Sequence, residues 1–158
     1  TTLALIAGDA LCSTILSYRN FDRQSFKNFH PGGKIGKSLR TLKEIMNTDI
    51  PLVPQKSKVL EAVIIMTKKK YGCAIIVDSK KNIKGVITDG DLRRSIKSDL
   101  LNNNVSDIMR NNPILVSSNT LVSSAINIMN KNSITSLIIS ENKKAIGIVN
   151  LKDCLDNE

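Results

Sequence analysis

The order of apolar and polar positions in the first half of the chain predicts a short series of strands and helices. Apolar residues three and four apart over about 58–69 predict a helix, and a second helix begins near Asp89. Short β-branched runs between polar turns predict strands at 52–53, 73–77 and 83–88. The predicted order of elements is therefore β-α-β-β-α.

The second half of the chain has the same order of elements. Its pattern predicts a strand at 115–116, a helix over about 121–131, strands at 136–139 and 145–149, and a short helix from Leu151. The polar run Asn102–Asn104 indicates a connector between the halves. Because each half mixes helices and strands, we expect an α/β (α+β) fold.

Identical or similar residues recur at a constant spacing in the two halves. At a spacing of 63 residues, Ile45-Met46 matches Ile108-Met109, Val53 matches Val116, Ala62 matches Ala125 and Met66 matches Met129. After a short gap the spacing becomes 62, which places Gly85 on Gly147 and Asp91 on Asp153. Because each copy is too small to bury a good core alone, we expect the two to pack about a pseudo-twofold axis, with a ligand groove between them.

The residues before the repeats have a pattern of their own. Apolar positions over 3–18 predict a helix whose apolar side has no partner in its own segment, so we expect it to pack on another chain or to be poorly ordered. A short helix is expected from Asp22 to about His30. Thr41 and Glu44 have the spacing of a capping box, which predicts a short helix leading into the first repeat.

The length and composition indicate a soluble globular protein. Of the 158 residues 41% are hydrophobic, and the apolar runs are far shorter than the ~20 residues of a membrane span. The chain has no starting Met and no basic segment ahead of an apolar run, so a signal peptide is not predicted. We interpret the sequence as a fragment of a longer protein.

The net charge of +9 raises the question of nucleic-acid binding. Nucleic-acid modules usually add stacking aromatic residues to a basic face, whereas aromatic residues make up only 3% of this chain and Trp is absent. Lys, Asn and Ile are abundant, and all three have A/T-rich codons, which explains much of the charge. Nucleic acid is therefore not the partner that we expect.

The three cysteines do not indicate a metal site or a disulfide framework. Cys12, Cys73 and Cys154 are far apart and have no C-x-x-C spacing. Cys12 lies in an apolar helical pattern and Cys73 opens an apolar strand. We therefore expect both to be small buried residues in a reducing cytosol, and we expect no bound metal.

The segment with the most chemical information is Gly85-Val86-Ile87-Thr88-Asp89-Gly90-Asp91, at the junction of a strand with a helix. Amides at a helix start favour a phosphate, the Thr88 hydroxyl can donate a hydrogen bond, and the Asp91 carboxylate can accept two from a ribose diol. The second copy keeps the glycine and Asp153 but has Asn150 in place of threonine. An Asp at a helix start is also an ordinary cap. Recurrence of the motif in both repeats favours a nucleotide site.

On these residues the region 43–155 resembles a tandem pair of CBS (cystathionine β-synthase) domains, with the G-h-h-T-x-x-D signature intact in the first copy and altered in the second. Such pairs typically bind adenosine-containing or other nucleotides between their repeats and regulate an attached enzyme or transporter. The positions that the resemblance implies for the nucleotide are Val53 and Val116 beside the base, Thr88 and Asn150 at the hydroxyl, and Asp91 and Asp153 at the ribose.

Two further stretches extend the resemblance, Gly8-Asp9-Ala10-Leu11 and Phe29-His30-Pro31-Gly32-Gly33. They are similar to the end of the sugar isomerase (SIS) domain of bacterial arabinose 5-phosphate isomerases, which join a SIS domain to a CBS pair. In that family this histidine contributes to the active site that interconverts ribulose 5-phosphate and arabinose 5-phosphate, which implies a catalytic role for His30. Imidazole suits proton transfer because its ordinary pKa is about 6.5. Taken alone, a histidine beside a turn is more often a cap or a surface residue.

The resemblance implies a domain organisation and a pathway. Residues 1–42 would be the end of the SIS domain and a linker, 43–97 the first CBS domain and 105–155 the second. The chain alone is expected to be inactive, because the other catalytic residues would lie upstream. The full enzyme would be cytoplasmic and need no cofactor, and its product would feed the synthesis of Kdo (the eight-carbon acid sugar of lipopolysaccharide).

The resemblance also implies ligands and partners. The regulatory ligand would be an adenine nucleotide or CMP-Kdo, the cytidine-linked end product of the pathway. Self-association is expected as a dimer of CBS pairs within a tetrameric enzyme, without a membrane partner. The alternative is a free-standing CBS pair that senses nucleotides or serves only as a structural dimerisation module, with the first 42 residues as its dimerisation arm. The coding sequence upstream of Thr1 would distinguish the two.

Overall fold

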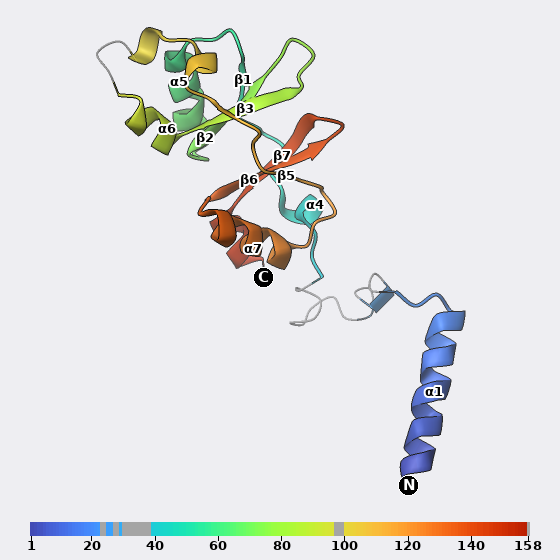
Figure 1. Ribbon diagram of the computed structural model, residues 1–158. Coiled ribbons are helices and arrows are strands. Elements are labelled where there is room, and N and C mark those ends of the chain that lie inside the picture. The colour runs from blue at the N-terminus through green and yellow to red at the C-terminus, as the bar shows by residue number, and fades with distance from the viewer. Residues whose placement is uncertain (23–24, 27–28, 30–38, 97–99, 158) are drawn as a thin grey trace. The chain divides into compact units, whose positions relative to one another are not determined.

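The structure is a computed structural model that describes residues 1–22, 25–26, 29, 39–96 and 100–157. The chain divides into two compact units, Thr1–Arg40 and Thr41–Glu158. The second unit contains both repeats, coloured from cyan to red in Figure 1.

In the first unit, helix α1 (Thr2–Tyr18) confirms the helix predicted over 3–18. None of its residues is buried, and Leu3 and Tyr18 are more than four-fifths exposed, at 84% and 88%. Its apolar side therefore has no covering partner among the described residues of its unit. Cys12 lies on this helix and is exposed, so the expectation that Cys12 is buried is wrong. Burial would need a packing partner for the helix.

The first repeat consists of the elements that its pattern predicts. They are β1 (Leu52–Pro54), α5 (Val59–Lys69), β2 (Cys73–Val77), β3 (Ile83–Thr88) and α6 (Asp89–Arg94). Strand β1 pairs parallel to β2, and β2 pairs antiparallel to β3. Strand β2 is buried along its whole length, as its unbroken apolar run leads one to expect.

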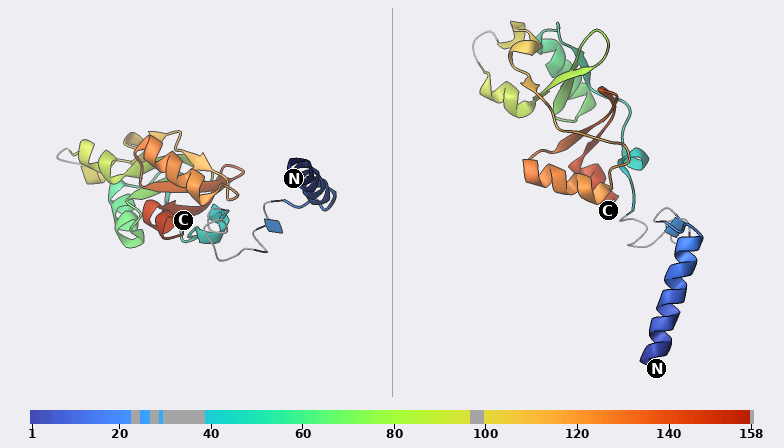
Figure 2. Two further views of the ribbon diagram at one scale, coloured as in Figure 1. Left: turned by 90° about the horizontal axis from the view of Figure 1, so that it is seen from below. Right: turned by 45° about the vertical axis from the view of Figure 1, so that its right-hand side comes forward.

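The second repeat has the same elements in the same order. They are β5 (Leu115–Val116), α7 (Val122–Asn132), β6 (Ser136–Glu141), β7 (Lys144–Asn150) and α8 (Leu151–Asp156). Two short 3₁₀ helices, η1 (Leu100–Asn102) and η2 (Val105–Asp107), connect the repeats. Figures 1 and 2 show the helices of each repeat on the outer side of its sheet, with the two sheets turned toward each other. The predicted order of elements is confirmed in both halves.

A shared core joins the two sheets. Ile75 and Val77 of β2 and Ile138 of β6 form one buried cluster, although they belong to different repeats. The main-chain N–H of Ile83 donates to the carbonyl oxygen of Lys143 at 2.9 Å and so links the two hairpins. The prediction that the two copies pack against each other is confirmed.

The segment that precedes each repeat packs on the other repeat. Helix α4 (Leu42–Ile45) starts with the predicted capping box at Thr41, but Leu42 is fully buried in the core of the second repeat, together with Val122. At the equivalent position, Val105 is fully buried in the core of the first repeat. These exchanged segments are a feature that the sequence pattern did not predict.

The exchange explains the glycine that recurs in both repeats. A Cβ atom on Gly85 would stand 2.9 Å from the Sδ of Met109, and one on Gly147 would stand 2.6 Å from the Sδ of Met46. Met46 and Met109 are themselves a matching pair of the repeat. At Gly85 the nearest atom to such a Cβ is the main-chain oxygen of Arg110, at 2.6 Å, so glycine is needed there because the backbone of the exchanged segment lies directly against the strand. At Gly147 the close contacts are all with the side chain of Met46.

Each exchanged segment continues along the edge of the sheet that it covers. Strand β4 (Arg110–Asn111) pairs antiparallel with β3 and sets Arg110 opposite Val86. In the other repeat Asn47 pairs with Ile148 at the equivalent place. Arg110 therefore comes to lie beside the motif of the first repeat, which follows β3.

Candidate functional site

A cleft of about 650 Å³ lies where the exchanged segment passes the end of β3. Three parts of the chain line it: the start of β2, the junction of β3 with α6, and residues of the second repeat. Its lining includes Tyr71, Thr88, Asp89, Arg93, Arg94 and Arg110, together with residues 111–114 and 132–136. The cleft thus has walls from both repeats, as expected for the ligand groove.

The junction of β3 with α6 is a capping box built from Thr88 and Asp91. The main-chain N–H of Asp91 donates to Oγ1 of Thr88 at 3.3 Å. In return, Oδ2 of Asp91 accepts from the main-chain N–H of Thr88 at 3.0 Å and from its hydroxyl at 2.6 Å. The two side chains therefore hold one another in place at the start of the helix.

Two arginines bind the other oxygen of this carboxylate. Arg94 Nη2 donates to Oδ1 of Asp91 at 2.7 Å, and Arg110 Nε donates to the same atom at 2.6 Å. Burial of the Asp91 carboxyl group would raise its pKa, but the hydrogen bonds from Thr88, Arg94 and Arg110 outweigh burial and lower the pKa. Asp91 is therefore ionised at neutral pH, and each of its oxygens already accepts two hydrogen bonds.

The sequence pattern missed both arginines of this site, Arg94 and Arg110, and Arg110 is the more distant of the two in the chain. It lies 19 residues after Asp91 in the chain, in the segment that leads into the second repeat. Only the exchange of the leading segments brings it to the first motif. The one signal in the sequence was its neighbour Met109, whose recurrence as Met46 marked a packed position without showing which repeat it packs on.

The chemistry of the cleft is suited to an anion and a diol. The side chains of Arg94 and Arg110 are 61% and 56% exposed, so both guanidinium groups keep N–H donors for a ligand while they bind Asp91. Arg93 adds a third cation to the wall. Arginine donors form short, charge-assisted hydrogen bonds with phosphate, and a carboxylate accepts from sugar hydroxyls.

Cys73 opens β2 in the wall of the cleft. Burial raises the pKa of the Cys73 thiol to about 11, so this cysteine is a neutral thiol at physiological pH rather than a nucleophile. Within the part of the chain that the structure describes, no three His, Cys, Asp or Glu side chains gather into a metal site.

The second motif forms an equivalent capping box at the start of α8. The main-chain N–H of Asp153 donates to Oδ1 of Asn150 at 2.7 Å. No ion pair joins Asp153 to any cation of the described residues. Neither residue lines the cleft, and Asp153 lies near Tyr71 instead. Burial raises the pKa of Tyr71, the hydrogen bond with Asn47 opposes this, and the charges of Asp153 and Asp49 add to the rise.

Thr88 lines the cleft, but Asp91 does not: its side chain is 7% exposed and meets the cleft through its ion pairs with Arg94 and Arg110, which do line it. Val53 is fully buried in the core of the first repeat, and Val116 packs against the core of the second. Neither lines the cleft, and their role beside a base stays a prediction. His30 lies outside the described residues, so its catalytic role also stays a prediction.

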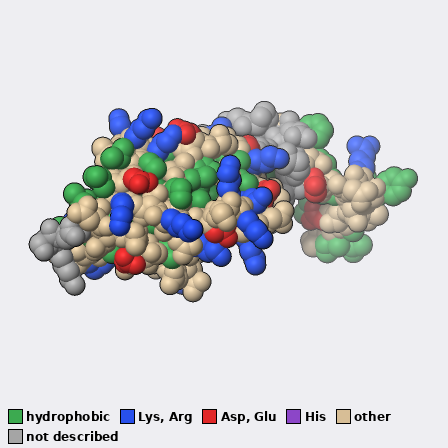
Figure 3. All heavy atoms as spheres, turned by 90° about the horizontal axis from the view of Figure 1, so that it is seen from above, with side chains coloured by type: hydrophobic (Ala, Val, Ile, Leu, Met, Phe, Trp, Pro, Cys, Tyr) green, Lys and Arg blue, Asp and Glu red, His purple; other side chains and the backbone are tan. Residues whose placement is uncertain are grey.

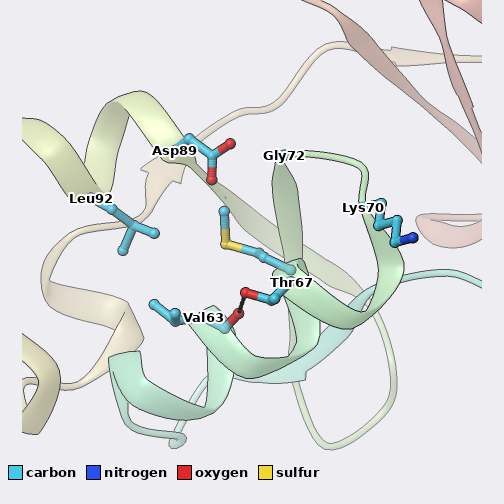
Figure 4. Close-up of a pocket in the computed structure, with 7 residues that line it drawn as sticks. Val63, Thr67, Lys70, Gly72, Asp89 and Leu92 are labelled. Atoms are coloured by element: carbon cyan, nitrogen blue, oxygen red, sulfur yellow. Dashed lines mark hydrogen bonds between the residues drawn. The ribbon is translucent and has the colours of Figure 1, made fainter.

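A smaller cavity of about 290 Å³ lies between α5 and α6. Figure 4 shows Val63 and Leu92 directed into the space between these helices. Gly72 and Asp89 line both this cavity and the larger cleft, so the two adjoin. The smaller cavity offers apolar walls beside the charged cleft, which suits the apolar part of a ligand.

On the face in Figure 3, Lys and Arg side chains are interspersed with acidic and apolar ones, whereas a nucleic-acid site typically has a basic stripe. None of the helices within the described ranges has both the length and the apolar character needed to cross a bilayer.

Comparison with known families and proteins identifies relatives of the chain. The profile of the CBS domain family matches residues 42–98 and 105–157, which are the two repeats. Uncharacterized protein RP505 of Rickettsia prowazekii is 40% identical over 155 residues, which cover 97% of this chain and 49% of that protein. Arabinose 5-phosphate isomerase KdsD of Yersinia pestis is 37% identical over 160 residues, which cover 98% of this chain and 49% of the enzyme. The chain thus spans about half the length of the curated relatives it matches.

A solved structure shows the same fold. The CBS domain pair of protein MJ0100, in complex with 5′-methylthioadenosine and S-adenosyl-L-methionine, superimposes with a TM-score of 0.67 at 21% identity. The match covers 75% of this chain and 94% of that one. The predicted tandem CBS-pair fold is confirmed.

Proposed function

Since the chain belongs to the CBS domain family, we propose that its cleft binds a regulatory nucleotide and that the pair controls an arabinose 5-phosphate isomerase. One observation carries the first part: the Asp91 carboxylate lies between two half-exposed arginines at the family's signature motif. Other CBS pairs support it, because solved structures of such pairs hold AMP, ATP, or S-adenosyl-L-methionine with 5′-methylthioadenosine.

The isomerase part rests on the curated relatives. The KdsD enzymes of Yersinia pestis and Escherichia coli are 37% and 34% identical over 98% of this chain, so the similarity includes the segment before the repeats. In this proposal the full-length protein interconverts ribulose 5-phosphate and arabinose 5-phosphate for Kdo synthesis. His30 acts there as an acid or base, while the other catalytic residues belong to parts of the protein outside this chain.

Two ligands fit the pathway and the cleft. An adenine nucleotide would report the energy state of the cell, and CMP-Kdo would report the level of the end product. Both carry a ribose with vicinal hydroxyls and at least one phosphate, so both match a carboxylate beside arginines. Self-association as a dimer of CBS pairs in a tetramer, in the cytoplasm, belongs to the same proposal.

The test is an isomerase assay of the full-length protein with and without each nucleotide. We expect turnover of ribulose 5-phosphate, and a change in kcat or KM when an adenine nucleotide or CMP-Kdo is added. Replacing His30 with Ala should lower kcat by about 10² or more, the usual effect of losing a positioned acid or base. Absence of turnover would remove the isomerase assignment. An active enzyme indifferent to every nucleotide would remove the regulatory one.

A further inference from the structure

The two motifs of the pair differ in charge at equivalent positions. Arg110 corresponds to Asn47, because each pairs with the equivalent residue of the strand beside it. Arg94 corresponds to Asp156, because each is the last residue of the six-residue helix that follows the motif. The cations that bind Asp91 in the first repeat are thus replaced by an amide and a carboxylate in the second.

The hydrogen bonds of Asp91 leave no free position for a ligand. Oδ2 accepts twice from Thr88, and Oδ1 accepts from Arg94 and Arg110. A carboxylate has about four lone-pair sites in all. A ribose hydroxyl can therefore bond Oδ1 only after one of the arginines has left it.

An arginine that leaves Asp91 needs a new anion. With a neutral nucleoside, the guanidinium group exchanges a charged partner for water, and the ribose contact only replaces what was lost. With a phosphate-bearing ligand, the guanidinium moves from the carboxylate to the phosphate and keeps a charge-assisted hydrogen bond. With a phosphate-bearing ligand, therefore, Asp91 accepts from the ribose and the displaced arginine still binds an anion.

We propose that the first cleft binds a ribonucleotide through its phosphate as well as its ribose, by transfer of Arg110 or Arg94 from Asp91 to the phosphate. We propose also that each chain binds a single such ligand. This inference rests on the proposed nucleotide-binding function and adds the chemical class and the stoichiometry.

The second motif lacks the groups that this exchange requires. Asp153 has no cation to hand over, and Asp49 and Asp156 add negative charge at positions where the first repeat has Asn112 and Arg94. The ammonium group of Lys69 is already bound to Asp49. Lys70 lines the smaller cavity beside α5 rather than the second motif. The motif itself carries one cation, Lys152, at the position of Gly90 in the first repeat, and no ion pair of the described residues joins it to Asp153. A phosphate near Asp153 therefore meets Asp49 and Asp156 beside a single lysine.

The fold by itself does not decide the class of ligand. Protein MJ0100 holds 5′-methylthioadenosine, which has no phosphate, whereas another CBS pair holds ATP. Discrimination between them must come from the side chains of each cleft. In this chain the arginines around Asp91 provide it.

The test begins with calorimetric titration of the intact chain. The probes are adenosine, AMP and ATP, cytidine, CMP and CTP, and inorganic tripolyphosphate. We expect one bound nucleotide per chain, with nucleotides bound at least about 10-fold more tightly than their nucleosides, the effect of one charge-assisted hydrogen bond. Raising the salt concentration should weaken nucleotide binding and leave nucleoside binding unchanged.

The decisive variant is Arg110→Gln. It should weaken nucleotide binding about 10-fold or more, while nucleoside binding stays the same or becomes tighter because Oδ1 of Asp91 is released. A merely structural role would weaken both. The matched control is Asn47→Gln at the equivalent position of the other repeat, which should change neither. The Arg110 side chain is half-exposed, so the fold is not at risk.

The outcomes separate this inference from the proposed function. Equal affinity for nucleoside and nucleotide, two nucleotides per chain, or an unchanged phosphate preference in Arg110→Gln would each overturn the inference and leave nucleotide sensing intact. Binding of tripolyphosphate alone, lost in Arg110→Gln, would keep the anion site and overturn the nucleotide reading. No binding of any probe would overturn both.

Discussion

The junction of β3 with α6 and the junction of β7 with α8 have the same backbone and different chemistry. Both form a capping box, in which the motif aspartate bonds back to the residue that caps the helix. Among the described residues, the first aspartate alone also binds arginines. Because Asp153 completes its box without a cation, the arginines at Asp91 are not needed for the cap. The comparison thus separates what the fold requires from what a ligand would use.

The largest expected effect is a loss of stability in Leu42→Ala, a variant that tests whether each repeat folds as a unit of its own. Replacing Leu42 with Ala removes a fully buried side chain from the second core, which should lower the free energy of unfolding by about 2–5 kcal/mol. Chemical denaturation measures the loss. Hydrogen exchange should rise first in β6 and β7, far along the sequence, rather than in the adjacent first repeat. Replacing the exposed Lys43 with Ala is the control, with an expected change within about 0.5 kcal/mol.

Opening of β1 and β2 before β6 and β7 in the Leu42→Ala variant would contradict the exchange. The mirror-image variant is Val105→Ala, which should loosen the first repeat instead. Its loss should be smaller, because the deleted part of valine buries less apolar surface than that of leucine.

The next effect concerns the motif carboxylates as ligand groups. Replacing Asp91 with Ala should weaken nucleotide binding by about 1.5–3 kcal/mol, or roughly 10- to 150-fold, because a charged hydrogen-bond acceptor is lost. Replacing Asp153 with Ala should leave the affinity unchanged. Calorimetry measures both. The melting temperature should fall in both variants because each loses one capping box, and it should fall further in Asp91→Ala, which also loses the ion pairs with Arg94 and Arg110. Equal affinity in both variants and the wild type would refute a ribose site at either motif.

A double substitution can make the second motif resemble the first. Asn47→Arg combined with Asp156→Arg supplies the missing cations at equivalent positions. New charged hydrogen bonds are worth about 1.5 kcal/mol each, so with both substitutions the second motif should gain about 100-fold in nucleotide affinity. Calorimetric stoichiometry should rise from one toward two nucleotides per chain. A stoichiometry that stays at one would show that the backbone around Asp153, and not its charge, prevents binding.

The smallest expected effect is the pH dependence of the Asp91 ion pairs. The pKa of Asp91 is lower in the folded chain than the value of about 3.9 expected when unfolded, so the pairs stabilise the fold above about pH 4. That stability is lost as pH falls through the folded pKa. The difference in unfolding free energy between wild type and Asp91→Asn should be at most about 1 kcal/mol near neutrality, because both arginines are half-exposed. It should shrink in acid.

Denaturation of the two proteins across this pH range measures that difference. Asp78 also has a lowered pKa, about 2, through hydrogen bonds from Asn82, but it is present in both proteins and cancels. A difference that stays constant below pH 4 would mean that the ion pairs do not stabilise the fold.

The periodicity of the sequence predicted nearly every strand and helix, because each spans one buried face with a clear pattern. Thr88 and Asp91 were singled out for a different reason, because their motif recurs at a fixed offset in the second repeat. Their role toward a ligand stays a prediction. The exchange was not predictable, because both repeats have the same apolar pattern. The residues around Leu42 therefore do not indicate in which of the two cores it is buried. Arg110 was missed as a consequence. Cys12 was misjudged because an apolar helix face was taken as buried, whereas no described residue of its unit covers that face.

The exchange of leading segments has the symmetry of a homodimer in which each subunit lends an arm to its partner. A protein made of one repeat would carry an arm with no acceptor in its own chain, and would find one only on a second copy. Joining two copies in a single polypeptide makes that partnership permanent. Within one polypeptide the two copies no longer need identical sequences. One copy can then have arginines at its motif while the other has acidic residues. Under the proposed single-site model, duplication turns a symmetric pair of equal sites into a scaffold with one site and one structural twin.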